Sequence, residues 1–346
     1  MNLRVLVDIG HPAHVHLFKH VIWKINEMGG ETCITTRKKD VATELMDAYG
    51  LPYQVIGQYS NRIDHLLSLI ITTNKLLKIA RSFNPHIILS VGSVHAIQAA
   101  TILNRLSVSL IDTEGSVLEG LINRMLASRI YNPEPFRTNM GRRQVHYNGY
   151  HEMSYLLPKY FHPDSSILPK YGLSPGDPYS IVRLVAWAAP HDWHQKGMVN
   201  VDGIVNHLEK HGKVLLSLEF RGKPNVAQNR VTIAPEDMHT MLAFASLYVG
   251  EGATMASECA SLGTPAIYVN SQRAGIVDAL VHAGLEYQVV PSETTYDDII
   301  KGIEEVFKKP PGYFRKKSQD YLMGKIDVVD FLVKDLLNMA RKKYLS

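Results

Sequence analysis

The stretch Gly250-Glu251-Gly252-Ala253-Thr254-Met255-Ala256-Ser257-Glu258 says most about how this chain folds and what it binds. It lies between two short apolar runs, 247–249 and 265–269, and is expected to form the loop and helix of a β-α-β unit, with the helix starting near residue 254. Glycine lets backbone N–H groups approach an anion, and a helix N-terminus adds partial positive charge. One turn into the helix, Glu258 is placed to accept hydrogen bonds from sugar hydroxyls. The residues expected to hold a nucleotide with a ribose are Gly250, Gly252, Ala253, Thr254 and Glu258. An ordinary β-α turn would contain the same small residues, so that interpretation stays open.

Length and composition set the class of protein. With 346 residues, the chain is too long for one small core and is expected to form two α/β domains. Its 45% hydrophobic and 20% charged residues are typical of a soluble globular protein. The net charge of +4 is small. The basic residues are scattered along the chain and gather only in the segment Lys308–Lys343. This distribution argues against a dedicated nucleic-acid binder.

Cysteine usage and the N-terminus indicate the compartment. Cys33 and Cys259 lie in apolar segments far apart in the sequence, so no disulfide framework is expected and a reducing compartment is indicated. The sequence begins directly with a strand at Leu3–Ile9, without a signal-peptide pattern, and no apolar run reaches the length that spans a bilayer. We therefore expect a cytoplasmic protein whose membrane contact is at most peripheral, at the inner face.

Short apolar runs alternate with helical periodicity through the first part of the chain. This alternation predicts a doubly wound parallel sheet with helices on both faces. The expected strands are 4–7, 32–36, 53–56, 87–91 and 108–111, and the expected helices are 15–28, 41–49, 63–83 and 95–104.

A segment rich in proline, glycine and tyrosine interrupts the alternation at residues 158–178 and is expected to be a linker. We expect Rossmann-like domains at 1–157 and 179–325, and a C-terminal helix at 326–346 that packs back on the first domain. The strands expected in the second domain are 180–186, 213–218, 231–233, 247–249 and 266–269. Ligands of doubly wound sheets bind at the carboxyl ends of the strands, so the loops there are expected to face a cleft between the domains.

The loop after the first strand carries four histidines within residues 11–20. A metal site is not expected there, because no cysteine or carboxylate joins them and Pro12 is expected to break the helix that would align them. A histidine at a helix start suits acid–base chemistry or the binding of phosphate and sugar hydroxyls, since its pKa lies near neutrality. We assign His14 to catalysis and His11 and His16 to the acceptor side of the cleft. His20 is expected within a helix, with a structural or surface role.

Acids follow the fifth expected strand, at Asp112, Glu114 and Glu119. An acid at the end of a central strand is costly to bury without a partner, so binding or proton transfer is predicted for Asp112 and Glu114. Capping of the next helix is an open alternative for Asp112 and the favoured role of Ser116. Ser93, from the turn after the fourth strand, and Glu119 are expected to line the same cleft.

A third loop, at residues 186–197, has the sequence Ala-Trp-Ala-Ala-Pro-His-Asp-Trp-His-Gln-Lys-Gly. Two tryptophans, two histidines, an acid and a lysine are costly side chains for a connector. We therefore expect ligand binding at this loop, with His191 and Lys196 contacting the nucleotide sugar and Lys196 facing phosphate.

These segments resemble the prokaryotic family catalogued as domain of unknown function 354. The motifs that carry the resemblance are Gly10–Lys19, Gly172–Tyr179, Val185–Asp192, Pro235–Ala245, Gly250–Glu258 and Leu262–Ile267. The resemblance covers nearly the whole chain. It implies a GT-B-like fold, in which two Rossmann-like domains face a cleft, but the family has no firmly assigned reaction.

The N-acetylglucosaminyltransferase of peptidoglycan synthesis is more distantly similar. It has a glycine-rich loop that ends in a histidine after its first strand, and His14 stands at that place, with Pro12 and Ala13 instead of glycines. The helix glutamate that holds the uridine ribose in that enzyme corresponds to Glu258, and Gly252, Ala253 and Ser257 also match the motif.

The non-hydrolysing UDP-N-acetylglucosamine 2-epimerases share the order of strands, loops and helices. They use carboxylates in the first domain, to two of which Asp112 and Glu119 correspond. The acid expected after the fourth strand is replaced by Gly92-Ser93, which argues against epimerisation.

The resemblance therefore implies a glycosyltransferase that uses a nucleotide-activated sugar, with UDP-sugar favoured, in cell-envelope or polysaccharide synthesis. His14 or Asp112 would deprotonate or orient the acceptor hydroxyl, which attacks the anomeric carbon as diphosphate leaves. Helix dipoles and cations, in place of a metal, would stabilise the leaving charge, and no cofactor is expected. Two alternatives stay open: a 2-epimerase-like isomerase and a non-catalytic protein that binds sugar nucleotides.

The acceptor is expected to be a saccharide or a lipid-linked group. An apolar helix expected at residues 63–78 ends in basic residues, so contact with a membrane carrying such a lipid is an alternative to packing on the sheet. Packing is the favoured role because the sheet needs a covering helix here.

Overall fold

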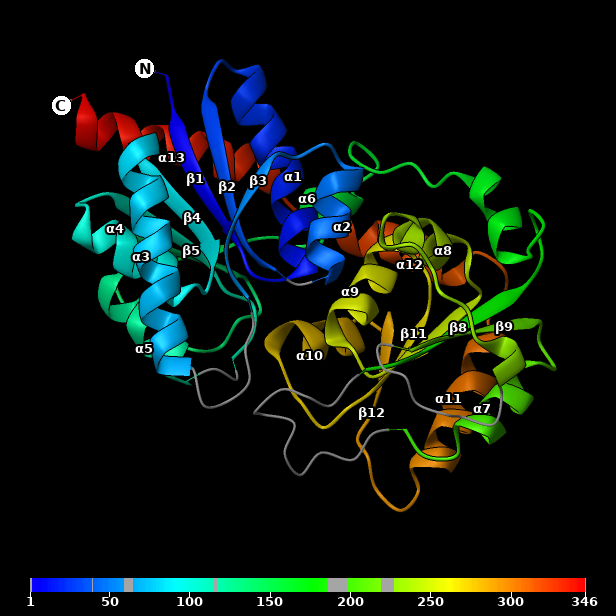
Figure 1. Ribbon diagram of the computed structural model, residues 1–346. Helices are drawn as coiled ribbons and strands as arrows, with labels where there is room; N and C mark the ends of the chain where they lie inside the picture. The colour runs from blue at the N-terminus through cyan, green and yellow to red at the C-terminus, as the bar shows by residue number, and fades with distance from the viewer. Residues whose placement is uncertain are drawn as a thin grey trace. The chain divides into compact units, whose positions relative to one another are not determined.

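The chain folds as two compact units. The computed structural model describes residues 2–38, 40–58, 65–114, 117–185, 198–218 and 227–345. Unit 1 comprises Met1–Tyr155 together with Lys325–Ser346, and unit 2 comprises Leu156–Gly324. Figure 1 shows the elements of both units with their labels.

Unit 1 is built on a seven-stranded sheet in the order β3-β2-β1-β4-β5-β6-β7. Every pairing in this sheet is parallel. Val5, Leu6 and Val7 of β1 are fully buried, as expected of a strand covered on both faces. The strands are β1 (Arg4–Ile9), β2 (Glu31–Lys38), β3 (Tyr53–Gln58), β4 (Ile87–Val91), β5 (Leu106–Leu110), β6 (Arg129–Pro133) and β7 (Gln144–Tyr147).

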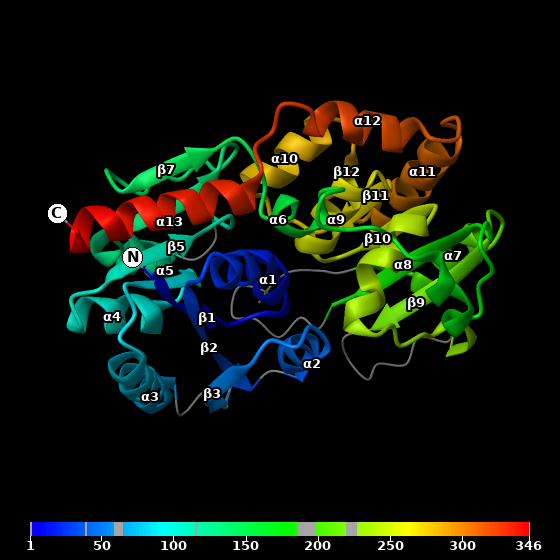
Figure 2. The same cartoon turned by 90° about the horizontal axis from the view of Figure 1, so that it is seen from above.

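Helices cover both faces of this sheet. On one face, α1 packs against α2 and α13, and on the other face α4 packs between α3 and α5 (Figure 2). The helices of unit 1 are α1 (Pro12–Glu27), α2 (Asp40–Ala48), α3 (His65–Phe83), α4 (Val94–Ile102), α5 (Val117–Leu126), the short α6 (Met153–Leu156) and α13 (Val328–Tyr344).

The C-terminal helix α13 belongs to unit 1. Asp330 pairs with Lys24 of α1, and Asp335 accepts a hydrogen bond from the hydroxyl of Tyr131 in β6. Phe331 packs edge-on against Tyr131, with ring centroids 5.3 Å apart. Both apolar and polar contacts thus hold α13 against the rest of unit 1.

Unit 2 is built on a five-stranded sheet in the order β12-β11-β10-β8-β9, again with parallel pairings throughout. One cluster of buried side chains joins this sheet to α7 and α11. The strands are β8 (Tyr179–Leu184), β9 (Lys213–Leu218), β10 (Leu247–Gly250), β11 (Ala266–Val269) and β12 (Glu286–Val289). The helices are α7 (Val201–Leu208), α8 (Met238–Phe244), α9 (Ala253–Leu262), α10 (Gly275–His282), α11 (Thr295–Phe307) and α12 (Tyr313–Leu322).

The segment at residues 158–178 is part of unit 2 and contains the 3-10 helix Ser165–Tyr171. The hydroxyl of Tyr171 and the ammonium of Lys170 both donate to Asp237, at 2.6 and 2.7 Å. These contacts fasten the proline-rich segment to the sequence just before α8.

The prediction of two doubly wound parallel-sheet domains is confirmed, with differences in single elements. The prediction of a strand at 231–233 is wrong. In the structure, Arg230 forms an isolated bridge to Leu216, and a 3-10 helix begins at Pro235. The sequence analysis did not identify β6, β7 and β12. Each of these three strands contains polar residues or a proline, which weakens the apolar signal of a buried strand.

The expectation that Pro12 breaks the first helix is also wrong. Helix α1 begins at Pro12, and His11 is its N-cap, whose Nδ1 accepts a hydrogen bond from the backbone N–H of Ala13 at 3.2 Å. Proline is well suited to the first helical position because the N–H it lacks has no partner within the helix. As a result, His14 and His16 lie on α1 itself rather than in a loop.

Helix α3 covers the sheet of unit 1. Leu76, Leu77 and Ala80 of this helix are buried in one cluster with Leu6 of β1 and Ile88 of β4. The favoured packing on the sheet is therefore observed for this part of the helix, whereas Ile70 and Ile71, nearer its start, are each 53% exposed. None of the described helices combines the length and apolar character needed to cross a membrane.

Candidate functional site

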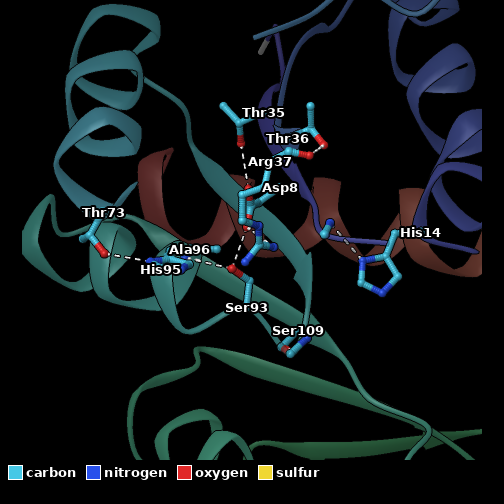
Figure 3. A network of polar contacts seen from close by, with 12 residues as sticks. Asp8, His14, Thr35, Thr36, Arg37, Thr73, Ser93, His95, Ala96 and Ser109 are labelled. Carbon is cyan, nitrogen blue, oxygen red and sulfur yellow. Dashed lines mark hydrogen bonds and ion pairs between the residues drawn. The ribbon is translucent and has the colours of Figure 1, made fainter. Parts of the chain in front are cut away.

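Asp8 is the centre of a polar network near the carboxyl ends of β1 and β2 (Figure 3). Its two oxygens accept hydrogen bonds from the hydroxyls of Thr35, at 3.0 Å, and Ser93, at 2.5 Å. The Arg37 guanidinium lies 3.7 Å from the same carboxylate. Asp8 is fully buried, so these partners offset the cost of burying its charge.

Ser93, predicted to line the cleft, has two structural contacts. Besides donating to Asp8, its hydroxyl accepts the backbone N–H of Ala96 at 3.3 Å and so caps α4. The structure therefore ties β1 to the start of α4 through this serine.

Gly10 allows Arg37 to reach this network. A Cβ at Gly10 would lie 2.3 Å from Nη2 of Arg37, so any other residue would displace the guanidinium. The backbone N–H of Gly10 donates to Nδ1 of His14 at 3.2 Å. Because Nδ1 accepts this bond, the neutral ring of His14 carries its proton on Nε2.

The electrostatic surroundings of His14 favour the neutral ring. Burial lowers the pKa of His14 well below its ordinary value, and the charges of His11, Arg37 and His151 lower it further, whereas Asp112 opposes them. At neutral pH, His14 is thus a hydrogen-bond donor at Nε2 rather than a cation.

Asp112 forms an ion pair with His151, a residue that the sequence analysis did not select. His151 Nδ1 lies 3.0 Å from one carboxylate oxygen, and the hydroxyl of Thr113 donates to the other at 3.1 Å. The Asp112 side chain is 32% exposed and that of His151 only 8%, so the histidine lies behind a carboxylate that solvent can reach. Helix α5 begins only at Val117, so capping does not explain Asp112.

The neighbouring groups favour the ionised forms of both side chains. Burial by itself would raise the pKa of Asp112, but the charge and hydrogen bond of His151, the Thr113 hydroxyl and His14 hold the pKa well below its usual range. For His151, burial would lower the pKa, but Asp112 and then Glu152 raise it above its ordinary value. The carboxylate of Asp112 therefore stays ionised at neutral pH.

Two buried polar atoms beside this pair have no hydrogen-bond partner among the described residues. They are Nε2 of His151 and the hydroxyl of Tyr147, at the end of β7. The two rings are nearly parallel, with centroids 6.3 Å apart. Burial, Asp112 and Glu152 raise the pKa of Tyr147 well above its ordinary value, so its hydroxyl keeps its proton.

The other residues predicted in unit 1 have varied surroundings. His16 is buried, stacks on Tyr155 and contacts the Tyr49 hydroxyl at 3.3 Å, which is a packing position inside the unit. Glu114 accepts the backbone N–H of Arg137 at 3.1 Å. His11 caps α1, as described above. The side chain of Glu119 lies outside the part of the chain whose side chains are described.

In unit 2, the glycine-rich stretch forms the turn between β10 and α9 as predicted. A Cβ at Gly250 would lie 2.1 Å from the buried hydroxyl of Tyr248, so only glycine fits there. Gly252 is the N-cap of α9, and among the described residues no side chain caps this helix start. The N–H groups of the first turn, from Ala253 and Thr254 onward, are therefore suited to an anion.

Glu251, within the same turn, is a buried acid with a structural function. Its two carboxylate oxygens accept the backbone N–H groups of Val185, at 3.0 Å, and Met198, at 2.6 Å. These residues flank the predicted loop that contains His191 and Lys196, and both of those residues lie outside the described residues. Glu251 thus fixes the two ends of that loop beside the glycine-rich turn.

Glu258, predicted to hold a ribose, is buried in α9 and faces His239 of α8. The distance from His239 Nε2 to a carboxylate oxygen of Glu258 is 3.0 Å. The sequence analysis noted His239 only as part of a family motif. The pairing arises because α8 and α9 pack against each other, a contact between residues 19 positions apart.

Comparisons with known proteins agree with this architecture. The family model described as "Protein of unknown function (DUF354)" matches residues 3–318. "Uncharacterized protein MJ0665" of Methanocaldococcus jannaschii is 24% identical over 282 residues, which cover 77% of this chain and 82% of that protein. The resemblance to this family is confirmed.

Two solved structures show the fold. The spinosyn forosaminyltransferase SpnP matches with a TM-score of 0.68 at 14% identity, covering 97% of this chain and 100% of that chain. UDP-GlcNAc 2-epimerase from Neisseria meningitidis, bound to UDP-GlcNAc, matches with a TM-score of 0.67 at 12% identity, covering 97% of this chain and 100% of that chain. The GT-B fold class is confirmed, together with the similarity to glycosyltransferases and to 2-epimerases.

Proposed function

The chain belongs to the DUF354 family, and we propose that it is a GT-B glycosyltransferase that uses a nucleotide-activated sugar, with a UDP-sugar as the favoured donor. Its product would serve polysaccharide or cell-envelope synthesis, and its acceptor would carry a sugar or lipid-linked hydroxyl. The fold shared with SpnP and with an epimerase bound to UDP-GlcNAc supports this class of substrate. The single observation that carries the proposal is the state of Asp112. Its carboxylate is ionised and partly exposed, forms an ion pair with His151, and by its charge raises the pKa of His14 against the effect of burial.

Unit 2 is the proposed donor-binding unit. The first turn of α9, without a capping side chain among the described residues, would take the diphosphate through its N–H groups and the helix dipole. Glu258 is the proposed ribose ligand, with one carboxylate oxygen fixed by His239. His191 and Lys196 are proposed to contact the donor from the loop whose two ends Glu251 fixes.

Unit 1 is the proposed acceptor unit, with Asp112 and His14 as catalytic residues and Glu114 as a further candidate. Asp112 would accept a hydrogen bond from the acceptor hydroxyl and take its proton as the oxygen bonds to the anomeric carbon. That hydroxyl becomes strongly acidic as the bond forms, so a carboxylate with a low pKa suffices. His14, whose Nδ1 already accepts from Gly10, would donate a hydrogen bond from Nε2 to orient the acceptor. His11, His16, Ser93 and Glu119 remain proposed acceptor-side residues.

The diphosphate of the donor is the leaving group of this step. The bond between the anomeric carbon and the diphosphate oxygen breaks as the new glycosidic bond forms, so one negative charge develops on the leaving group. Donors that are already in place where charge develops stabilise the transition state without reorganisation. The start of α9 would perform this role.

Epimerisation is the second candidate, favoured by the structural similarity to 2-epimerases. An epimerase needs acid and base groups at the carbon whose configuration changes, and Ser93 stands where an acid is expected. The Ser93 hydroxyl donates to Asp8 and caps α4, so it is a poor substitute for that acid. For this reason glycosyl transfer is the preferred proposal.

Calorimetric titration of the protein with a panel of UDP- and GDP-sugars tests the donor. Binding of one member is expected, with a loss in Glu258→Ala and no change in Glu236→Ala, which alters an exposed acid of the same unit. If no nucleotide sugar binds and Glu258→Ala changes nothing, the proposal fails. The same titration on His14→Ala, combined with a turnover assay, tests whether the protein only binds sugar nucleotides. In that case His14→Ala would keep the affinity for the donor, and neither this variant nor the wild type would turn over any donor.

Incubation with UDP-N-acetylglucosamine in deuterated water separates the two reactions. A 2-epimerase would place deuterium at C2 of the recovered sugar nucleotide, whereas a glycosyltransferase would leave C2 unlabelled and release UDP only in the presence of an acceptor. Deuterium at C2 would therefore replace the preferred proposal by the second candidate.

A further inference from the structure

Three metal-ligating side chains converge on the face of unit 2 that α7 and α11 cover. His207 Nε2 lies 2.7 Å from Oε1 of Glu304, and His211 Nε2 lies 3.9 Å from the same oxygen. One ligand atom from each residue lies within 4.8 Å of the other two. Within the described ranges, no other trio of histidine, cysteine, aspartate or glutamate gathers in this way.

The positions of these side chains are set by packing. Buried residues of α7 (Ile204, Val205 and Leu208) and of α11 (Ile299, Ile303 and Val306) belong to the same core cluster. The two helices therefore hold a fixed position relative to each other. His211 follows the end of α7, and its ring stacks flat on Phe307 of α11, with centroids 4.0 Å apart and planes 4° from parallel. The ligand atoms thus come together on a scaffold that exists without any ion.

From this convergence we infer a binding site for Zn²⁺, formed by His207, His211 and Glu304 with solvent as the fourth ligand. Two histidines and one glutamate are ligands that Zn²⁺ commonly takes when one position stays open. Tetrahedral Zn²⁺ bound at about 2.0–2.1 Å places neighbouring ligand atoms about 3.3 Å apart. The observed distances of 2.7 and 3.9 Å lie on either side of that value. A shift of about 0.6 Å in each brings the glutamate oxygen to this spacing. The ligand nitrogens of the two histidines lie within 4.8 Å of each other.

Glu304 is the ligand whose side chain can move enough to change these two distances. Its side chain is 45% exposed, compared with 15% for His207 and 25% for His211, so it has the most freedom to turn. The exposure of all three side chains also gives a water molecule access to the fourth position.

Nearby cations weaken the site without blocking it. Lys210 Nζ lies 3.5 Å from Nδ1 of His207, and the charge of Lys308 acts on Glu304. Both lysines are exposed and can turn towards solvent when an ion binds. The ion would join α7 to α11 and would therefore stabilise the folded state of unit 2, because these ligand atoms are apart in the unfolded chain.

The test is calorimetric titration of the full chain with zinc chloride, using protein without affinity-tag histidines and freed of metal with a chelator. One ion per chain is expected. His211→Ala and Glu304→Gln should each weaken the affinity at least tenfold, whereas His282→Ala, which alters an exposed histidine of α10, should leave it unchanged. Glu304→Gln keeps an oxygen that can accept the His207 hydrogen bond, so the fold is retained even if an alanine variant unfolds.

Thermal unfolding provides a second readout. Saturating Zn²⁺ should raise the unfolding midpoint of the wild type by several degrees and that of Glu304→Gln by less. If the protein shows no saturable binding, or if His211→Ala and Glu304→Gln bind Zn²⁺ as tightly as the wild type, the cluster is a hydrogen-bonded His–Glu contact only and the inference is overturned. These outcomes do not depend on which reaction the protein catalyses.

Discussion

The Asp112→Asn substitution is expected to lower the pKa of His151 from above to below the ordinary value of a histidine. In the folded protein, His151 Nδ1 lies 3.0 Å from the Asp112 carboxylate. Hydrogen bonds to charged groups contribute about 1.5–3 kcal/mol, so replacing the carboxylate by a neutral amide removes an interaction of this size that favours the charged imidazole ring. Burial would then outweigh the remaining charge of Glu152 and favour the neutral ring.

The same pair makes stability depend on pH in a defined direction. The pKa of His151 is raised on folding, so its contribution is fully present below the unfolded value of about 6.5 and is lost as pH rises through the folded pKa. The pKa of Asp112 is depressed on folding, so its contribution is present above the unfolded value of about 3.9 and is lost as pH falls through the folded pKa. Asp112→Asn should therefore cost most stability between about pH 4 and 6.5, and less at about pH 9.

Histidine-selective NMR measures this pKa directly. The His151 ring resonance is identified by its absence from the spectrum of His151→Gln, and its titration is compared between wild type and Asp112→Asn. Glu114→Gln is the matched control, because Glu114 accepts a backbone N–H from Arg137 rather than contacting His151. An unchanged His151 pKa in Asp112→Asn would refute the reasoning, since some other group would then set the protonation of the pair.

Four further substitutions test the surroundings of the candidate site by urea or thermal unfolding. Gly250→Ala should destabilise unit 2 by about 1–3 kcal/mol, because its Cβ would lie 2.1 Å from a buried tyrosine hydroxyl. Gly252→Ala, with its nearest neighbour 3.7 Å away, should unfold at nearly the wild-type urea concentration, and equal losses in both would contradict the steric argument. Glu251→Gln keeps only one oxygen for two backbone N–H groups and should cost about 1.5–3 kcal/mol; a urea midpoint equal to that of the wild type would show that the carboxylate is not needed. Asp8→Asn should cost about 1.5–3 kcal/mol, because it removes the charge of a buried carboxylate that accepts hydrogen bonds from the hydroxyls of Thr35 and Ser93; a melting temperature like that of the wild type would contradict this.

The alternation of strands and helices could be predicted because it depends on neighbours in the sequence. Strands such as β1 and β4 are apolar on both faces, and helices such as α11 and α13 repeat apolar residues with helical spacing. β6 and β7 escaped prediction because they lie towards the edge of the sheet and include residues such as Asn132 and His146. Pro12 was misassigned because a proline that starts a helix and one that breaks it look alike in the sequence.

The candidate site divides in the same way. The sequence was sufficient to select Asp112, His14 and the stretch from Gly250 to Glu258, since chemically active side chains directly follow apolar strands there. It could not select His151, which follows a strand that was not predicted and lies far from Asp112 along the chain. The same holds for His239 beside Glu258.

The sequence by itself thus determined most of the order of elements, the parallel class of the two sheets and several of the strand ends where polar groups collect. Only the tertiary structure decided which of these groups come into contact: Asp112 with His151, Glu251 with the ends of a loop, and Glu304 with two histidines. The physical reason is that periodicity is a local property of the chain. Charge pairing depends instead on strand order and helix packing, which join residues at any separation and exclude the water that would otherwise screen them.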